Sequence, residues 1–291
     1  MQITVDAHAK LNLTLDITGL KSDGYHLLDM VVQSLDLHDT LTLTTNESGR
    51  ITLKTSGREL PEESGENIVE TAAGLFYEKL GEPCGGLKIA VKKRIPVAAG
   101  LGGGSADAAG VLLGLNRLHQ RPFTLDELED MALELGADVP LCLTGGTLQA
   151  QGVGGILSPL PDLPDCWFVL VRPGEKVSTG EMYRRYDQLA DSPHPDTEAA
   201  VGAICGGDLP ELGRQLYNVF EAVWQTAEMD KARRMLLHAG ALGATLSGSG
   251  PTLYGLFDER DAAARAQSLL EEVFEDVLLC RPAPKGCEID D

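Results

Sequence analysis

PVAAGLGGGSADAAG, residues 96–110, is a glycine-rich loop between a predicted strand and a predicted helix. Leu87, Ile89 and Val91 are apolar at every second position, as in a strand, and four glycines then occupy five positions at 100–104. Glycines permit close backbone approach and positive φ angles, which turn successive N–H groups toward one point. Ser105 is expected where the helix begins, and the amides of a helix N-terminus favour a phosphate. The sequence therefore predicts a site for a polyphosphate.

A turn that merely joins a strand to a helix is the plain alternative for such a loop. The following helix is well specified, because apolar residues recur on one face at Ala108, Val111, Leu112, Leu115 and Leu118. A Walker loop needs Gly, four residues, then Gly-Lys and Ser or Thr, and no stretch supplies it. Ser105 and Asp107 occupy the positions where a dinucleotide fingerprint needs its third glycine. The loop therefore represents a different class of phosphate site.

The loop resembles that of the GHMP kinases, the superfamily of galactokinase, homoserine kinase and mevalonate kinase, which opens with Pro-X-X-X-Gly-Leu-Gly. Within it, the match is to the GLGGGSSDAA loop of the family that phosphorylates 4-diphosphocytidyl-2-C-methyl-D-erythritol. Ala106 replaces the second serine, which keeps the backbone cradle and removes one hydroxyl. The resemblance continues in AKLNLTLDITGLKSDGYH, ENIV, GADVPLCLTGG, VSTGEMY, YNVFE and LSGSGPTLYGLF, at residues 9–26, 66–69, 136–146, 177–183, 217–221 and 246–257.

The expected class is α+β, because strands and helices mix without regular βαβ alternation. The resemblance implies the two-domain GHMP kinase fold, with an N-terminal domain like domain 2 of ribosomal protein S5 and a ferredoxin-like C-terminal domain. A cluster of prolines at 159–164 suggests the boundary, with an ATP-binding domain over 1–158 and a substrate-binding domain over 159–291. The implied activity is ATP-dependent phosphorylation of the 2-hydroxyl of the cytidyl substrate in non-mevalonate isoprenoid synthesis, with Mg²⁺ accompanying ATP.

Individual elements follow from periodicity and capping signals. Thr124 and Glu127 form a capping-box signature for a helix that ends at Gly136. Strands are predicted at residues 2–5, 11–17, 41–45, 51–55, 167–171 and 252–257. Helices are predicted from Asn67, from Ser105, and over residues 180–189, 209–227, 229–239 and 262–274.

Composition limits the partners without selecting the function. The chain has 291 residues and 43% hydrophobic content, enough for two domains with cores. Its 44 acidic and 24 basic side chains give a net charge of −20, which predicts repulsion of nucleic acid and anionic membranes. The resemblance implies a small-molecule partner, the cytidyl diphosphate substrate. Lys92, Lys93 and Arg94 are then the densest positive group near the loop, with a solvated strand end as the alternative.

The sequence also predicts the cellular location of the protein and the state of its cysteines. No apolar run has membrane-spanning length and the first residues lack a signal-peptide segment, so a cytoplasmic protein is expected. Six cysteines without a CxxC pair and six scattered histidines predict neither a disulfide framework nor a zinc site.

Phosphoryl transfer needs the donor held in line and the acceptor hydroxyl positioned and deprotonated. Asp138, expected at the mouth of a strand, suits a general base, and Lys10 suits stabilisation of the acceptor oxygen. On the residues alone, a turn aspartate and a solvated lysine are the likelier interpretations. The resemblance assigns catalysis to both, because its catalytic Lys and Asp fall in the AKxN and GADVP motifs. Asn12 lies two residues from Lys10, on the same strand face, and is predicted to bind the acceptor.

The remaining site residues are implied by the resemblance. Tyr25 and His26 follow a tight Asp-Gly turn and would serve the cytosine ring, with Tyr183 opposite and Thr179 as a further contact, whereas a hairpin lid over the core is the alternative. ATP contacts are assigned to Asn67, Lys93, Pro96, Gly100, Leu101, Gly102, Gly103, Gly104, Ser105 and Ala106. Ser105 is the candidate magnesium ligand. Ser247 to Gly250 would line the cleft near the transferred phosphate, or form an ordinary turn.

Two rival functions use the same loop. A diphosphomevalonate decarboxylase shares the fold but is a lyase, and it has no cytosine for the SDGYH and VSTGEMY motifs to hold. A nucleotide-binding regulator that has lost catalysis would not need Lys10 and Asp138. Both motifs and both residues favour the kinase.

Overall fold

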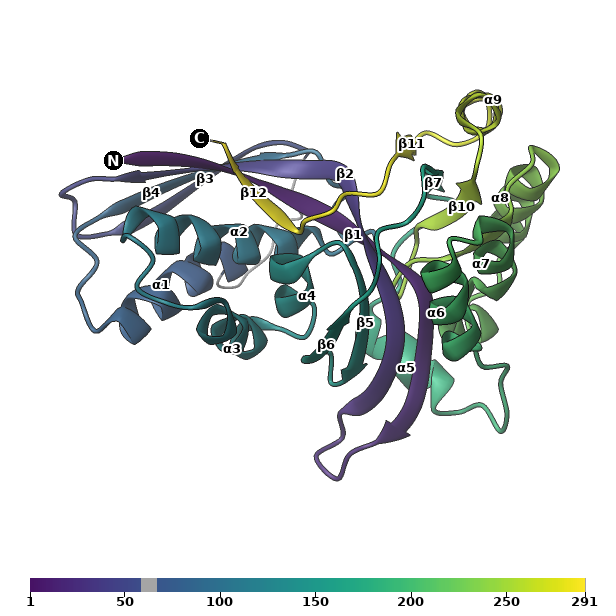
Figure 1. The fold of residues 1–291 in the computed structure, drawn as a ribbon, viewed down its shortest axis with the longest axis horizontal. Coiled ribbons are helices and arrows are strands. Elements are labelled where there is room, and N and C mark those ends of the chain that lie inside the picture. Colours follow the sequence, from purple (N-terminus) through teal and green to yellow (C-terminus); the bar gives the residue numbers. More distant parts are fainter. Residues whose placement is uncertain (59–66, 291) are drawn as a thin grey trace.

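The computed structural model describes residues 1–58 and 67–290, so Glu66 of the ENIV motif lies outside the described residues. Within that part, two sheets organise the molecule (Figure 1). The eight-stranded sheet has the order β12-β1-β2-β4-β3, with β5 on β2, β6 on β5 and β8 on β1. Its strands are β1 (Gln2–Leu20), β2 (His26–Thr45), β3 (Ile51–Gly57), β4 (Leu87–Lys93), β5 (Thr147–Gly152), β6 (Ile156–Pro159), β8 (Tyr217–Asn218) and β12 (Cys287–Asp290). The four-stranded sheet has the order β11-β7-β10-β9, formed by β7 (Trp167–Val171), β9 (Gly243–Leu246), β10 (Leu253–Phe257) and β11 (Val277–Cys280).

The long antiparallel pair β1–β2 connects the two halves of the molecule. The predicted strands at 2–5 and 11–17 are parts of one 19-residue strand, so their separation was wrong. The polar residues between them are buried with partners, as His8 Nδ1 contacts Leu35 O at 2.7 Å. Register shifts at three places along the pair bend it, because an extra residue in one strand increases its twist. The resulting hairpin runs down between α5 and β5 (Figure 1).

Helices α1 (Ile68–Leu80), α2 (Gly103–Leu118), α3 (Leu125–Leu135) and α4 (Val139–Thr144) cover one face of the first sheet (Figure 1). The predicted capping box of α3 is present, with Thr124 and Glu127 bonding reciprocally and the helix ending at Gly136. α2 lies close against the sheet because Gly114 has no side chain: a Cβ there would be 2.4 Å from Leu43 Cδ1. This close packing fixes the position of the N-terminus of α2.

The second half contains α5 (Thr179–Tyr186), α6 (Thr197–Gly206), α7 (Leu209–Gln215), the 3-10 turn η1 (Val219–Ala222), α8 (Ala227–His238) and α9 (Arg260–Glu271). The predicted helix over 209–227 is wrong, because α7 ends at Gln215 and β8 and η1 follow. The reason is Asn218, which is fully buried and donates its amide to Leu246 O and Gly248 O at 2.9 and 2.8 Å. Its extended backbone is compatible with those bonds and with the 3.0 Å bond from Phe220 N to its Oδ1.

The last strand, β12, lies beside the first strand, β1. β12 pairs antiparallel with β1, so residues 287–290 belong to the first sheet although they lie far beyond residue 159 (Figure 1). The structure has the predicted α+β composition, with helices packed against mixed and antiparallel sheets. In the described ranges, no helix is both long and apolar enough to cross a bilayer.

Candidate active site

The glycine-rich loop leads directly into α2. Gly100 and Gly102 have φ angles of 79° and 70°. Gly103 and Gly104 are instead helical, because α2 begins at Gly103 with Gly102 at the N-cap position. The expectation that the helix begins at Ser105 was therefore wrong, and two of the four glycines use the positive φ that glycine permits. Ser105 lies in the first turn of α2, and the cap has no side-chain hydrogen bond.

A cavity of about 650 Å³ opens over this loop and over the start of α1. Its lining includes nine residues predicted to contact ATP, namely Asn67, Lys93, Pro96, Gly100, Leu101, Gly102, Gly103, Gly104 and Ser105. Ala106 is the predicted contact that does not line it, since its side chain is fully buried and its N–H bonds Gly102 O at 2.8 Å. The helix amides before Ala106 have no preceding turn to bond, which makes the cavity floor a site for anions.

A buried charge cluster lies at one wall of this cavity. Lys93 Nζ is 2.6 Å from Asp107 Oδ2 and also forms an ion pair with Asp39. Burial raises the pKa of Asp107 to about 7, with Lys93 opposing the shift and Asp39 adding to it. Two carboxylates thus share one ammonium, so Lys93 is not the uncompensated cation that the sequence suggested.

The neighbours of Lys93 do not replace it. Lys92 is exposed, and Arg94 donates to Thr40 Oγ1 at 2.7 Å. Lys93 and Arg94 of the predicted basic group therefore have partners within the protein, and Lys93 still lines the cavity.

A second cavity, of about 720 Å³, adjoins the first through Gly100, Gly102 and Ser105, which line both. The β1–β2 hairpin, the start of α4 and α5 surround it. It brings together the residues predicted for catalysis and for the acceptor, which are Lys10, Asn12, Tyr25, His26, Asp138, Thr179 and Tyr183. These residues are up to 173 positions apart in the sequence, from Lys10 to Tyr183, and meet only through the fold.

Lys10 is the centre of a polar group in this second cavity. Its Nζ donates to Asn12 Oδ1 at 2.7 Å and lies 3.3 Å from Asp138 Oδ2. The Lys10 side chain is only 5% exposed whereas that of Asp138 is 37% exposed, so the carboxylate faces the cavity. Asn12 Oδ1 also accepts from Gly248 N at 3.0 Å, which fixes the amide. A carboxylate open to the cavity beside a buried ammonium suits proton transfer from a hydroxyl.

Asp138 occupies the N-cap of α4 and not the mouth of a strand, so that expectation was wrong. Pro140 in the first helical turn explains the difference, because proline's fixed φ and missing N–H are compatible with a helix start. The Asp138 side chain makes no capping bond and is left to the cavity.

The far end of this cavity carries aromatic rings. His26 and Tyr183 stack with centroids 4.4 Å apart, and Asp187 Oδ1 lies 2.8 Å from His26 Nε2. Tyr183 also contacts the edge of Phe220, and burial, together with the charge of Asp138, raises its pKa to about 12. Tyr25 is 67% exposed on the hairpin turn. The hairpin and α5 therefore present the stacked rings of His26 and Tyr183, and the hairpin also carries the exposed ring of Tyr25.

The turn at 247–250 lies against the phosphate loop. Ser247 Oγ donates to Gly100 O at 2.9 Å, and a Cβ on Gly100 would be 2.2 Å from Ser247 O, so only glycine allows this approach. Gly248 and Ser249 line the second cavity, as the sequence suggested for this segment. Sequence reasoning missed Lys176, which also lines it and bonds Ser249 Oγ at 2.7 Å. A basic residue directly before the VSTGEMY motif was the available signal.

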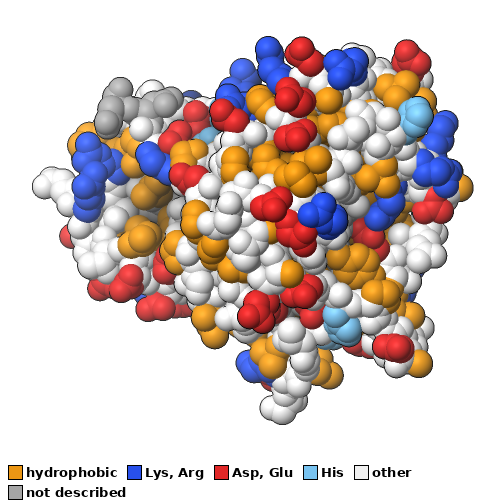
Figure 2. Space-filling view, turned by 45° about the vertical axis from the view of Figure 1, so that its right-hand side comes forward, with side chains coloured by type: hydrophobic (Ala, Val, Ile, Leu, Met, Phe, Trp, Pro, Cys, Tyr) orange, Lys and Arg blue, Asp and Glu red, His pale blue; other side chains and the backbone are white. Residues whose placement is uncertain are grey.

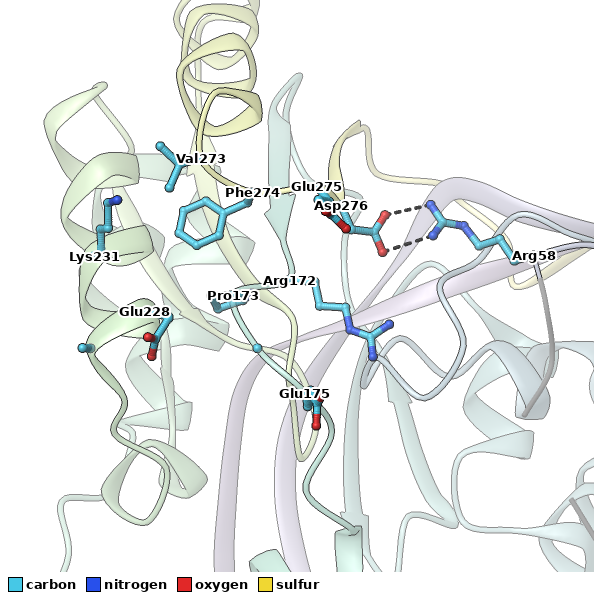
Figure 3. Close-up of a pocket in the computed structure, with 12 residues that line it drawn as sticks. Arg58, Arg172, Pro173, Glu175, Glu228, Lys231, Val273, Phe274, Glu275 and Asp276 are labelled. Carbon is cyan, nitrogen blue, oxygen red and sulfur yellow. Dashed lines mark hydrogen bonds and ion pairs between the residues drawn. The ribbon is translucent and has the colours of Figure 1, made fainter. Parts of the chain in front are cut away.

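A third hollow, of about 930 Å³, lies between the β7–α5 loop, α8 and the end of α9 (Figure 3). Arg58 closes one side of it through paired hydrogen bonds to Asp276 at 2.9 and 3.1 Å. It contains none of the residues predicted for the site and mixes acidic with basic side chains. Figure 2 shows the same mixture over one whole face, with red and blue side chains interspersed. Charge alone therefore does not mark this hollow as a site.

Comparison with known proteins agrees with this geometry. The model of the GHMP kinases N terminal domain matches residues 67–146, and that of the GHMP kinases C terminal domain matches residues 200–276. A 4-diphosphocytidyl-2-C-methyl-D-erythritol kinase from Alkaliphilus metalliredigens is 38% identical over 94% of both chains. One from Lachnoclostridium phytofermentans is 41% identical over 91% of both chains.

Solved structures give the same result. The crystal structure of a 4-(cytidine 5'-diphospho)-2C-methyl-D-erythritol kinase matches with a TM-score of 0.79 at 34% identity, covering 97% of this chain and 99% of the other. A mevalonate diphosphate decarboxylase from Staphylococcus aureus has a TM-score of 0.73 at 16% identity, over 100% of this chain and 98% of its own. At that identity, the likeness shows the fold alone.

Proposed function

The chain belongs to the GHMP kinases, in the family of 4-diphosphocytidyl-2-C-methyl-D-erythritol kinases, and from that premise we propose how its residues carry out the reaction. The activity is ATP-dependent phosphorylation of the 2-hydroxyl of the cytidyl substrate, a step of non-mevalonate isoprenoid synthesis. One observation carries the assignment of roles. The cavity with Lys10 and Asp138 shares Gly100, Gly102 and Ser105 with the cavity over the phosphate loop. A donor in one and an acceptor in the other would meet at these three residues.

Asp138 accepts the proton of the acceptor hydroxyl. Its carboxylate is exposed to the cavity, makes no capping bond, and lies beside an ammonium that holds its position. Lys10 donates a hydrogen bond to the acceptor oxygen and stabilises the charge that develops on it. Asn12 fixes the lysine through the 2.7 Å bond and is itself fixed by Gly248 N. General-base catalysis and a positioned cation are the contributions that phosphoryl transfer needs from the protein.

The donor phosphates bind over the N-terminus of α2. Gly100 and Gly102 turn the backbone of the loop with positive φ, and the first amides of α2 point into the cavity floor. Asn67 caps α1 through its Oδ1, which accepts from Val69 N at 3.0 Å, so its amide group is held at the cavity wall. ATP binding thus rests on backbone donors more than on basic side chains.

Magnesium is the metal that this chemistry uses, since a bound divalent cation would neutralise charge on the phosphates. The residues fit an ion held mainly by the nucleotide, because no three His, Cys, Asp or Glu side chains cluster into a metal site among the described residues. Ser105 is the proposed protein ligand, because it lines both cavities in the first turn of α2.

The cytosine ring lies at the aromatic end of the acceptor cavity. Tyr183 is supported by the stacked His26 ring, which Asp187 orients through Nε2. Tyr25 is free to cover the base because its ring is largely exposed. Thr179 stands between the two ends, with its hydroxyl 2.9 Å from Ser249 Oγ. A nucleobase offers a π surface for stacking and polar edges for hydrogen bonds, which suits this set.

The test is ADP formation with three acceptors. The purified protein is incubated with ATP and 4-diphosphocytidyl-2-C-methyl-D-erythritol, mevalonate 5-diphosphate or homoserine, and ADP and the phosphorylated product are measured. We expect product with the cytidyl substrate only. Turnover of mevalonate 5-diphosphate with release of CO₂ would assign the decarboxylase activity instead, and nucleotide binding without turnover of any acceptor would favour a regulator.

A further inference from the structure

Lys176 is a cation of the acceptor cavity that the mechanism above does not use. It lies in the loop between β7 and α5, two residues before the Ser178 cap of α5. Its Nζ donates to Ser249 Oγ at 2.7 Å and to Gly250 O at 2.8 Å. Both partners are neutral oxygens, so they orient the ammonium without compensating its charge.

The other basic side chains that line this cavity have acidic partners. Lys10 lies 3.3 Å from Asp138, and Arg184 lies 2.7 Å from Glu181. His26 is 2.8 Å from Asp187. Among the described residues, Lys176 has no carboxylate within ion-pair distance. A partly buried ammonium held only by neutral groups is costly, and an anion that enters the cavity would offset that cost.

The burial of Lys176 and the charges around it also favour binding of an anion. Burial, and then the positive charges of Lys10 on β1 and Arg172 at the end of β7, lower its pKa to about 8, against the opposing charge of Asp138 at the start of α4. The charges that act on the ammonium are thus dominated by other cations. An anionic ligand would reverse this balance.

The anchors of Lys176 place it beside the phosphate loop. A Cβ on Gly100 would be 3.1 Å from Gly250 O and 3.2 Å from Gly250 N, so the turn that holds Lys176 packs directly on the loop. Lys10, on β1, packs on the same loop, since a Cβ on Gly102 would be 2.9 Å from Lys10 Cγ. The Lys10 side chain and the turn that holds Lys176 therefore both pack on the loop where it borders the acceptor cavity.

We propose that Lys176 binds the non-bridging oxygens of the phosphoryl group in transfer, as a second cationic catalytic residue beside Lys10. In that step the bond from the acceptor oxygen to the γ-phosphorus forms while the bond to the β-phosphate oxygen breaks, and ADP leaves. Lys176 transfers no proton and stays charged throughout. The proposal rests on the proposed function, because it places the transferred group at the junction of the two cavities.

The experiment compares Lys176→Met, Lys176→Arg and the matched control Lys231→Met, which removes an exposed lysine from the third hollow. We expect Lys176→Met to lower kcat by about 10²-fold, as the loss of one preorganised donor at developing charge does, and to leave the KM for the cytidyl substrate within about threefold. Lys176→Arg should restore part of kcat. Lys231→Met should behave as the wild type.

A second readout does not depend on the acceptor. Calorimetric titration should show ATP binding weakened by roughly ten- to a hundredfold in Lys176→Met, as for one lost charged hydrogen bond, and ADP binding unchanged, because only ATP carries the γ-phosphate. The pH profile is a third readout. In the wild type, kcat/KM for ATP, which reports the free enzyme, should fall as pH rises through about 8, where Lys176 loses its charge, and in Lys176→Arg this fall should move to higher pH.

Three results would overturn the proposal. Unchanged kcat and ATP affinity in Lys176→Met would show that the ammonium does not meet the transferred group. A raised KM for the cytidyl substrate and weaker binding of CDP, at unchanged kcat, would assign Lys176 to the acceptor diphosphate instead. Equal weakening of ATP and ADP would assign it to the α- or β-phosphate. Failure of the wild type on the cytidyl substrate would refute the proposed function, and the ATP and ADP titrations would still test Lys176.

Discussion

Replacing Asp138 with asparagine tests the chemical step with little change of shape. The carboxylate is 37% exposed, makes no capping bond, and has the Lys10 ammonium as its ion-pair partner at 3.3 Å. Asparagine keeps the volume and loses the ability to accept a proton at neutral pH. The reaction then proceeds without its general base, while the nucleotide cavity, which Asp138 does not line, is unaltered.

The expected magnitudes separate catalysis from stability. Loss of a general base lowers kcat by about 10² to 10⁴, which raises the barrier by roughly 3–5 kcal/mol. The free energy of unfolding should fall by only about 1–2 kcal/mol, because the buried Lys10 keeps its hydrogen bond to Asn12 and its lost partner was partly solvated. The variant should thus remain folded and bind ATP while turnover nearly stops.

The assay is single-turnover phosphorylation of the cytidyl substrate by rapid quench, with ATP affinity from calorimetry and the melting temperature as a folding check. Asp187→Asn is the matched control, since it removes a carboxylate from the same cavity at its aromatic end. There the lost partner of His26 should raise KM roughly fivefold, for a hydrogen bond worth about 1 kcal/mol, at unchanged kcat. If Asp138→Asn retained more than half of the wild-type chemical rate, Asp138 would not be the base.

Burial and contacts lead to four further predictions. Lys93→Met should destabilise the protein by about 3–5 kcal/mol in urea unfolding, because two buried carboxylates lose their ammonium, and an unchanged midpoint would contradict the cluster. Asp107→Asn should be far milder. Because the pKa of Asp107 is raised from 3.8 to about 7 in the folded protein, wild-type stability should fall as pH rises through that window, and the variant should lose this dependence. Tyr25→Ala should raise KM for the cytidyl substrate by roughly 5- to 100-fold without lowering the melting temperature, whereas Tyr183→Ala should change both, because its ring packs on two others. A loss of stability with unchanged KM in Tyr25→Ala would place that ring in the core. Gly102→Ala should lower kcat more than ATP affinity. The new Cβ would be 2.9 Å from Cγ of Lys10, and the φ of 70° at this position is unfavourable for alanine. A kcat equal to that of the wild type would show that the lysine moves freely.

Several local features were predictable because they depend on neighbours in the chain. The capping box of Thr124 and Glu127 spans four residues, and the common face of Lys10 and Asn12 follows from the two-residue period of a strand. The start of α4 was missed although Pro140 signals it, because Asp followed by Val-Pro is as common in turns.

The amino-acid sequence by itself determined the phosphate loop, the family motifs and the capping box of α3, because glycine and capping residues act within a few positions. The tertiary structure alone decided which charges are free. Lys93, beside the loop, is neutralised by Asp39 and Asp107, whereas Lys176, which no motif marked, has only Ser249 and Gly250 as hydrogen-bond partners within the described part of the chain. The tertiary structure also decided the pairing of β12 with β1, because these two strands lie far apart in the sequence. Such pairings depend on burial and on partners far apart in the sequence, and periodicity within one segment carries no information about them.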